Sequence, residues 1–386
     1  MTMRFEFATA ARIVFGAGTL REAGPIARSL GARALVVTGR TPGRAERLLA
    51  ILAEQGVSAV TFPLTGEPEV ETIRAGVVTA SRGQCDLVIG FGGGAALDAA
   101  KAIAVMLTNE GQLLDYLEVI GRGKTLTAAP VPVIAIPTTA GTGSEVTCNA
   151  VLASPEHRVK VSLRSPLMLP KVALVDPELT YDLPPAVTAS TGLDALAQLM
   201  EPFVCTRANP LTDALCVEGM SRVARSLRRA FEFGRDAAAR EDMAVASLFG
   251  GMTLANAGLG AVHGLAGPLG GMFPVPHGTA CAALLPPVVA ANLRALRERA
   301  PKSDALARYG TIARLLTGRA DASADDGSEW LAALVTHLGV PRLGSYGFGR
   351  EHVAELVGKA ANASSMKANP IELTPAELAA IIQSAS

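Results

Sequence analysis

Short, continuous apolar runs alternate with stretches of helical character in the first half of the chain. The runs are residues 34–38, 59–62, 86–89, 131–136 and 172–175. They are rich in β-branched residues and lack polar alternation, which predicts strands buried on both faces. The stretches 41–56 and 67–83 lie between the first three runs, contain helix-forming residues and end at a glycine. This rhythm predicts βαβ units and a parallel sheet, with residues 5–15 ahead of it as a hairpin or edge strand.

The pattern of apolar positions changes near Asp176-Pro177 and Pro184-Pro185. Beyond that point the apolar residues follow helical steps of 4, 3, 4 and 4, which place them on one helix face: Cys216, Met220, Val223, Leu227 and Phe231. No comparable strand run follows. We therefore predict an α/β, Rossmann-like dinucleotide-binding domain over residues 1–180 and an all-helical domain over 181–386. Residues 318–329, rich in Asp and Gly, predict an exposed loop.

Charge and composition exclude several classes of protein. The 386 residues contain 35 Lys+Arg and 35 Asp+Glu, and this balance argues against a partner such as nucleic acid or an anionic membrane. Hydrophobic residues make up 49% and the mean hydropathy is +0.32, which excludes disorder and indicates apolar surface covered either by many buried helices or by a subunit partner. We expect a homodimer or higher homo-oligomer. The longest apolar stretches are interrupted before the roughly 18 to 20 residues of a membrane span. The segment Met1–Phe7 lacks a signal-peptide layout, so we expect a cytoplasmic protein.

The cysteines predict no covalent or metal framework. There are five, an odd number, at wide spacings and without a CxxC pair: Cys85, Cys148, Cys205, Cys216 and Cys281. This pattern indicates neither a disulfide framework nor a thiolate zinc site. We interpret them as scattered, reduced core thiols.

Two loops that follow predicted strands carry candidate phosphate and cofactor contacts. The first contains Gly92, Gly93 and Gly94, with a helix predicted from about Ala95. Adjacent glycines let backbone N–H groups approach a phosphate, although a tight packing turn is the alternative. The second loop, residues 137–145, contains small hydroxyl residues that suit a cofactor crevice, with an N-cap cluster as the alternative: Thr138, Thr139, Thr142 and Ser144.

A second constellation has the composition of a divalent metal site. Asp194 and Gln198 are four residues apart, which places both on one helix face. His263 and His277 flank a segment dense in Gly and Pro. Asp194, Gln198 and the two histidines could together bind a metal. The alternative is that the histidines only form hydrogen bonds within a core or loop.

Together these motifs resemble the iron-containing (group III) alcohol dehydrogenases, whose fold is shared with glycerol dehydrogenase and dehydroquinate synthase. The resemblance spans essentially the whole chain. Its markers are Gly92–Gly94 with Asp98 and Lys101, residues 136–145, Asp176-Pro177, residues 194–196, and His263 with residues 276–278. It implies a Rossmann-like nucleotide domain, a helical C-terminal domain, and a nicotinamide and a metal between them.

The resemblance also implies roles for individual residues. The pyrophosphate would lie at Gly93, Gly94 and Ala95. Lys160 would lie near the nicotinamide ribose. The remaining implied cofactor contacts belong to the same two loops: Gly92, Asp98, Thr138, Thr139, Thr142 and Ser144. The metal ligands would be Asp194, Gln198, His263 and His277, positions at which the family has one Asp and three His.

The chain departs from the family pattern at four places. Gln198 replaces a histidine ligand, and its neutral amide oxygen is a poorer donor than imidazole for Fe²⁺ or Zn²⁺. Gly267 stands where the family has a proton-transfer histidine, and Ala95 replaces a serine. Gly39 replaces an Asp that accepts from the ribose 2′-OH in NAD-preferring members. With Arg40 next to it and Arg44 nearby, NADP or dual use is favoured over NAD, unless both arginines are simply solvated.

We therefore predict an NAD(P)-dependent alcohol dehydrogenase or carbonyl reductase. It would interconvert a small alcohol with an aldehyde, ketone or keto acid, assisted by Fe²⁺ or Zn²⁺, with Asp194, His263 and His277 as catalytic residues. Three alternatives remain open: a metal-independent enzyme similar to maleylacetate reductases, a lyase of the dehydroquinate synthase type, and an inactive nucleotide-binding paralogue. The sequence does not identify the substrate.

Overall fold

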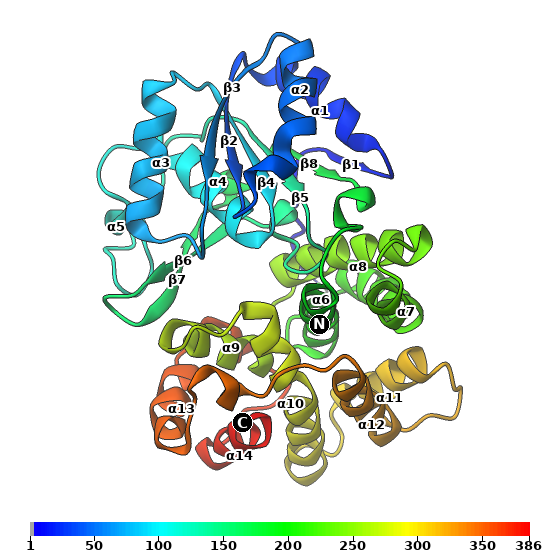
Figure 1. Cartoon of the computed structure of the whole chain (residues 1–386). Helices are drawn as coiled ribbons and strands as arrows, with labels where there is room; N and C mark the ends of the chain where they lie inside the picture. The colour runs from blue at the N-terminus through cyan, green and yellow to red at the C-terminus, as the bar shows by residue number, and fades with distance from the viewer. Residues whose placement is uncertain (1–3) are drawn as a thin grey trace. The chain divides into compact units, whose positions relative to one another are not determined.

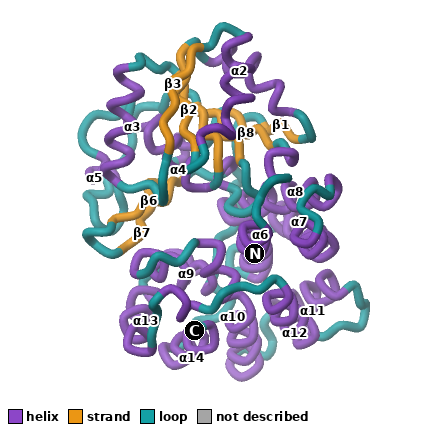
Figure 2. The backbone as a smooth tube through the Cα atoms, viewed as in Figure 1, coloured by secondary structure: helices purple, strands orange, loops and turns teal. Residues whose placement is uncertain are grey.

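The structure is a computed structural model that describes residues 4–386; the start of the N-terminal segment considered above, residues 1–3, lies outside the described residues. The chain divides into two compact units. The α/β unit comprises residues 9–139 and 143–181. The helical unit comprises residues 140–142 and 182–386 together with the described residues up to Ala8. Figure 1 colours the chain by residue number, and Figure 2 shows that all strands drawn belong to the α/β unit.

A parallel sheet forms the centre of the α/β unit. Its six strands within the described residues are β1 (Ile13–Phe15), β2 (Arg33–Thr38), β3 (Ser58–Pro63), β4 (Leu87–Gly92), β5 (Val133–Pro137) and β8 (Val172–Val175). They lie in the order β1-β8-β5-β4-β2-β3, and every neighbouring pair is parallel. The predicted parallel sheet is confirmed.

Helices cover both faces of this sheet. Alternate residues of β2 point to opposite faces, so Val36 joins a core with α1 (Ala23–Leu30) and α2 (Glu46–Glu54). Val37 joins the opposite core, with α3 (Val70–Arg82) and α4 (Gly94–Met106). Strand order reverses between β2 and β4, and the carboxyl ends of strands at such a reversal form the usual nucleotide crevice.

The edge strand, one of the two alternatives predicted for residues 5–15, is confirmed, because β1 pairs in parallel with the distant β8 at the edge of the sheet. One feature of the α/β unit differs from the prediction. An antiparallel hairpin of β6 (Asn149–Ser154) and β7 (Val159–Arg164) was not predicted from the sequence. The short helix α5 (Leu113–Tyr116) completes the unit.

The helical unit consists of packed helices around one apolar core. They are α6 (Pro185–Val204), α7 (Pro210–Glu232), α8 (Ala237–Asn256), α9 (Ala261–Met272), α10 (His277–Arg299), α11 (Asp304–Thr317), α12 (Ala324–His337), α13 (Val353–Ala361) and α14 (Pro375–Ala385). The predicted apolar face lies on α7, where Cys216, Met220 and Val223 are buried. The predicted loop 318–329 is wrong beyond Ser323, because Ser323 and Asp326 form a capping box that starts α12.

Short 3₁₀ helices connect the longer elements. They span Thr19–Glu22, Pro42–Ala45, Ser144–Val146, Pro166–Met168, Pro177–Thr180, Leu343–Tyr346, Arg350–His352 and Ser364–Ala368.

One helix of the described residues, α10, is long and apolar enough to cross a bilayer, with a window of mean hydropathy 1.4. Within the structure 67% of that window is buried. Helices α8 and α9 reach the same criterion only as a pair that is bent by 95°. These helices contribute to the apolar core of the helical unit, which is the ordinary position of such helices in a globular fold.

Candidate nucleotide loop and metal centre

The glycine-rich loop joins β4 to the start of α4. Gly93 is the N-cap of α4, and no side chain caps this helix end. Uncapped N–H groups at a helix N-terminus attract phosphate. A Cβ placed on Gly93 would lie 3.4 Å from Thr139 Oγ1, so Thr139 borders the loop. Gly92 has a packing role, because a Cβ there would lie only 2.7 Å from the Cβ of Ala96.

The second predicted cofactor loop is tied to α4 by a buried network. The backbone N–H of Thr138 donates to Gly92 O at 2.8 Å, which joins the two loops directly. Ser144 Oγ donates to Asp98 Oδ1. Lys101 Nζ, fully buried, lies 3.1 Å from Asp98 Oδ1 and donates to Ser144 O at 2.9 Å. Asp98 and Ser144 therefore hold the loop in place, since both are engaged within the protein.

Glu145, at the end of this loop, is buried. Burial raises the pKa of Glu145 to about 7, although its own backbone N–H and the charge of Lys101 lower it in part. Lys101 forms its ion pair with Asp98 instead. Glu145 therefore titrates near neutral pH.

The residues predicted to set the nucleotide preference lie at the end of β2. A Cβ on Gly39 would meet no atom within 4 Å, and Gly39 N would lie 3.4 Å from a Cβ on Gly92. Arg40 is exposed, whereas Arg44 donates from Nη2 to Leu179 O at 2.6 Å. Lys160, on β7, pairs with Glu67 at 3.1 Å. Arg40 is thus the more available of the two arginines.

The structure brings three predicted metal ligands together within the helical unit. They come from three helices: Asp194 from α6, His263 from α9, and His277 at the first position of α10. Asp194 Oδ1 lies 3.3 Å from His263 Nε2 and 3.7 Å from His277 Nε2. Asp194 is 1% exposed, and its Oδ1 is a buried atom without a hydrogen-bond partner among the described residues.

Two further residues complete the cluster, and sequence reasoning missed both. Glu201 Oε2 lies 2.6 Å from His263 Nδ1, and Glu201 Oε1 accepts from Val262 N at 2.7 Å. Cys281 Sγ lies 3.6 Å from His277 Nε2 and 3.7 Å from His263 Nε2. Helical spacing could have indicated both, because Glu201 is two turns after Asp194 and Cys281 is one turn after His277.

The neighbours of Asp194 and His263 shift the pKa values of both residues towards their charged forms. Burial alone would raise the pKa of Asp194, but His277 and His263 hold it below its ordinary value. Burial alone would lower the pKa of His263, whereas Cys281, Glu201 and Asp194 together hold it well above its ordinary value. In both cases the polar and charged neighbours together outweigh desolvation.

Gln198 and Gly267 depart from the family pattern in different ways. Gln198 is buried, and its Oε1 has no hydrogen-bond partner among the described residues. This oxygen lies against α8, 3.2 Å from where a Cβ of Gly250 would be. At Gly267 a Cβ would meet open space within 4 Å.

The donor set fits a divalent cation. A buried carboxylate oxygen without a hydrogen bond among the described residues faces two imidazole Nε2 atoms, and Glu201 orients one of these rings from its other nitrogen. This is the arrangement in which protein metal ligands are commonly held.

Comparisons with known proteins agree with the fold. Residues 10–177 match the model of the family "Iron-containing alcohol dehydrogenase", and residues 188–386 match that of "Fe-containing alcohol dehydrogenase family, C-terminal". A 1,3-propanediol dehydrogenase of Klebsiella pneumoniae is 36% identical over 390 residues, which cover 96% of each chain. The solved structure of a 1,3-propanediol oxidoreductase is 33% identical, with a TM-score of 0.92 and complete coverage of both chains.

A third relative is a sulfoacetaldehyde reductase of Bifidobacterium kashiwanohense, solved in complex with NAD⁺. It is 30% identical, with a TM-score of 0.87 and coverage of 100% of this chain and 99% of the other. The family matches, the parallel sheet and the ligand cluster lead to one assignment. The chain belongs to the iron-containing alcohol dehydrogenase family of NAD(P)-dependent oxidoreductases.

Proposed function

We propose that this protein is a metal-assisted dehydrogenase or reductase that exchanges hydride between a nicotinamide nucleotide and a small alcohol or carbonyl compound. The observation that carries the proposal is the buried cluster of Asp194, His263 and His277. The names of two relatives, which refer to 1,3-propanediol and sulfoacetaldehyde, support an alcohol or aldehyde substrate.

The residues of the cluster would have distinct roles. When bound, the metal would polarise the substrate oxygen and the nicotinamide would carry the hydride. Asp194, His263 and His277 would hold the metal, and Gln198 would be a weaker oxygen donor or a hydrogen-bond partner of the substrate. Glu201 accepts from Nδ1–H of His263, which leaves the Nε2 lone pair free for a metal.

The α/β unit would bind the nucleotide. We assign the pyrophosphate to the N–H groups of Gly93, Gly94 and Ala95 at the uncapped end of α4. Gly92, Thr138, Thr139 and Thr142 would shape the site, Asp98 and Ser144 would hold its second loop, and Lys160 would approach the nicotinamide ribose. Because position 267 carries no side chain, solvent water would take the substrate proton.

We further propose that NADP is accepted at least as well as NAD. Gly39 presents no carboxylate to repel a 2′-phosphate, and Arg40 is exposed beside it. Since a Cβ on Gly39 meets open space, Gly39→Asp is compatible with the fold. We expect this variant to raise the KM for NADPH about tenfold relative to NADH. An unchanged ratio of the two KM values would refute the role of Gly39.

A metal-independent reduction is the second candidate function, and the Gln198 and Gly267 departures favour it. In that case Asp194, His263 and His277 would bind the carbonyl compound or donate the proton directly. A lyase of the dehydroquinate synthase type and an inactive paralogue are the remaining candidates. Only a dehydrogenase or reductase would consume NAD(P)H during turnover, so net NAD(P)H consumption excludes both of these candidates.

The test combines elemental analysis with turnover. Protein purified anaerobically is stripped, loaded with excess Fe²⁺ or Zn²⁺, and assayed for NAD(P)H oxidation with a panel of short aldehydes, ketones and keto acids. We expect about one metal per chain and activity that is lost on chelation and restored by the metal. Turnover without bound metal would replace the proposal by the metal-independent candidate, and no NAD(P)H oxidation under either condition would remove the dehydrogenase assignment.

The location and assembly of the enzyme are also proposals. The described cysteines are all free, which supports a reducing compartment such as the cytoplasm. The apolar composition supports a homodimer or larger homo-oligomer, which light scattering would test.

A further inference from the structure

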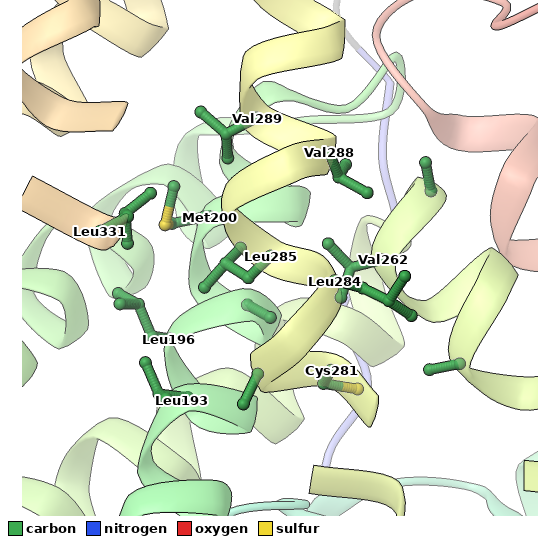
Figure 3. Close-up of a cluster of buried hydrophobic side chains, with 14 of the residues drawn as sticks. Leu193, Leu196, Met200, Val262, Cys281, Leu284, Leu285, Val288, Val289 and Leu331 are labelled. Carbon is green, nitrogen blue, oxygen red and sulfur yellow. The ribbon is translucent and has the colours of Figure 1, made fainter. Parts of the chain in front are cut away.

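Cys281 lies inside the ligand cluster, although nothing in the family pattern assigns it a role. It is on α10, one helical turn after His277, and is fully buried. One ligand atom each from Asp194, His263, His277 and Cys281 can be chosen so that all four lie within 4.8 Å of one another. Figure 3 shows Cys281 on the same helix as Leu284, Leu285 and Val288, at the end of the apolar cluster.

The separations agree with the edges of a tetrahedral metal site. Ordinary bond lengths of about 2.3 Å for zinc to sulfur and about 2.0 to 2.1 Å for zinc to nitrogen or oxygen give edges of about 3.6 Å for S···N and about 3.4 Å for N···O. Cys281 Sγ lies 3.6 Å and 3.7 Å from the Nε2 atoms of His277 and His263. Asp194 Oδ1 lies 3.3 Å and 3.7 Å from Nε2 of His263 and His277.

The chemistry of the surroundings favours the thiol over Gln198 as fourth ligand. Cys281 Sγ lies beside the Nε2 atoms of both histidines, whereas Gln198 Oε1 lies against Gly250 of α8. A coordinated thiol is deprotonated by the metal, and thiolate binds zinc more strongly than a neutral amide oxygen. Asp194 Oδ1, buried and without a hydrogen-bond partner among the described residues, independently offers an oxygen ligand at the same place.

We propose that Cys281 is a metal ligand that takes the place of the histidine missing at position 198. The site is then Asp194, His263, His277 and Cys281, and it selects Zn²⁺ more strongly than a set of one Asp and three His would. Two anionic ligands neutralise the dication in the buried site. Substrate oxygen would enter as an additional donor, as in zinc enzymes that expand to five ligands. This inference rests on the proposed metal-assisted function.

The experiment identifies the coordinating atoms by spectroscopy of the complete protein loaded with Co²⁺ or Zn²⁺. We expect Co²⁺ to give an intense thiolate-to-cobalt charge-transfer band in the near ultraviolet. X-ray absorption of the Zn²⁺ protein should show one sulfur at about 2.3 Å. Cys281→Ser should abolish the band and weaken Zn²⁺ binding about tenfold or more. Cys216→Ser, another fully buried helical cysteine, is the matched control and should keep both properties.

The outcomes separate this inference from the proposed function. Metal bound at full stoichiometry with only nitrogen and oxygen neighbours would overturn the role of Cys281 and leave the metal-assisted function intact. Failure of the unaltered protein to bind Co²⁺ or Zn²⁺ would overturn both. The absorption measurement needs no variant, so poor folding of Cys281→Ser would not prevent a decision.

Discussion

At the residue scale, Glu201 determines which nitrogen of His263 faces the cluster. Its two oxygens are held by Nδ1 of His263 at 2.6 Å and by Val262 N at 2.7 Å. Replacement by Gln removes the negative charge that supports the ring in this tautomer. We expect Glu201→Gln to weaken metal binding about 10- to 100-fold, measured by competition with a chelator of known affinity. Glu329→Gln, an exposed change on α12, should leave the affinity unaltered; an equal loss in both variants would contradict this role of Glu201.

Glu145 gives a second prediction at this scale, which concerns stability and pH. Its folded-state pKa of about 7 lies above the ordinary value of 4.5, so the unfolded chain ionises first as pH rises. The folded state is therefore fully favoured below pH 4.5 and loses stability up to about pH 7, by roughly 3 kcal/mol at most. Glu145→Gln removes this loss.

Urea unfolding from pH 5 to pH 8 measures the effect. The stability of Glu145→Gln relative to the unaltered protein should increase from pH 5 to about pH 7 and level off by pH 8. Glu54→Gln, an exposed change in the same unit, should show no such trend. A difference between Glu145→Gln and the unaltered protein that is constant with pH would show that Glu145 is ionised throughout.

Individual residues also show where prediction from the sequence ended. The pair Asp194 and Gln198 was found by its helical spacing, and His263 and His277 by the rarity of histidine. The same spacing applied to His277 would have reached Cys281, but the cysteines were interpreted as core thiols. A core thiol at this position can also be a metal ligand. Cys281 belongs to the apolar core, and its Sγ contacts the Nε2 atoms of His263 and His277.

At the element scale, the β4–α4 loop contains two glycines with different requirements. Gly93 has an extended backbone with φ of −75°, which any residue can adopt, and a Cβ there meets only Thr139. Gly93→Ala should keep the melting temperature but place a methyl group at the phosphate position. We expect about a tenfold weaker Kd for NADPH, measured by fluorescence titration.

Gly92→Ala is the matched comparison in the same loop. Its added Cβ would lie 2.7 Å from the Cβ of Ala96, so overpacking should cost about 1 to 3 kcal/mol of stability. If Gly93→Ala bound NADPH with unchanged affinity, the pyrophosphate would not lie at the start of α4.

Elements built from local patterns could be predicted, and those that depend on distant partners could not. The parallel strands β2, β4 and β8 follow from continuous apolar runs. Strand β1 could not be distinguished from a hairpin, because its partner β8 lies about 160 residues later in the chain. The hairpin β6–β7 alternates buried and half-buried residues within a region for which no strand is predicted from the sequence. Helix α12 was missed because its capping residues, Ser323 and Asp326, also fit an exposed loop.

At the scale of the whole molecule, two compact units with separate binding chemistry should respond separately to their ligands. Three helices of the helical unit, α6, α9 and α10, carry the proposed metal ligands, whereas the β4–α4 loop of the α/β unit carries the proposed phosphate site. A metal present at 100 times its Kd increases the free energy of unfolding of the folded state that binds it by about 2.7 kcal/mol. Amide hydrogen exchange of the complete protein can show which segments are stabilised.

We expect Zn²⁺ to slow amide exchange in peptides of α6, α9 and α10, with little change in β2 or β4. NADPH should instead slow exchange at residues 90–97 and 137–142. Helix α12 supplies no predicted ligand and is the internal reference for both additions. Because α9 begins beside Glu201 and α10 begins at His277, the largest effect of Zn²⁺ should fall on the first turns of these two helices. Protection by Zn²⁺ confined to the α/β unit would place the metal elsewhere and overturn the assignment of the cluster.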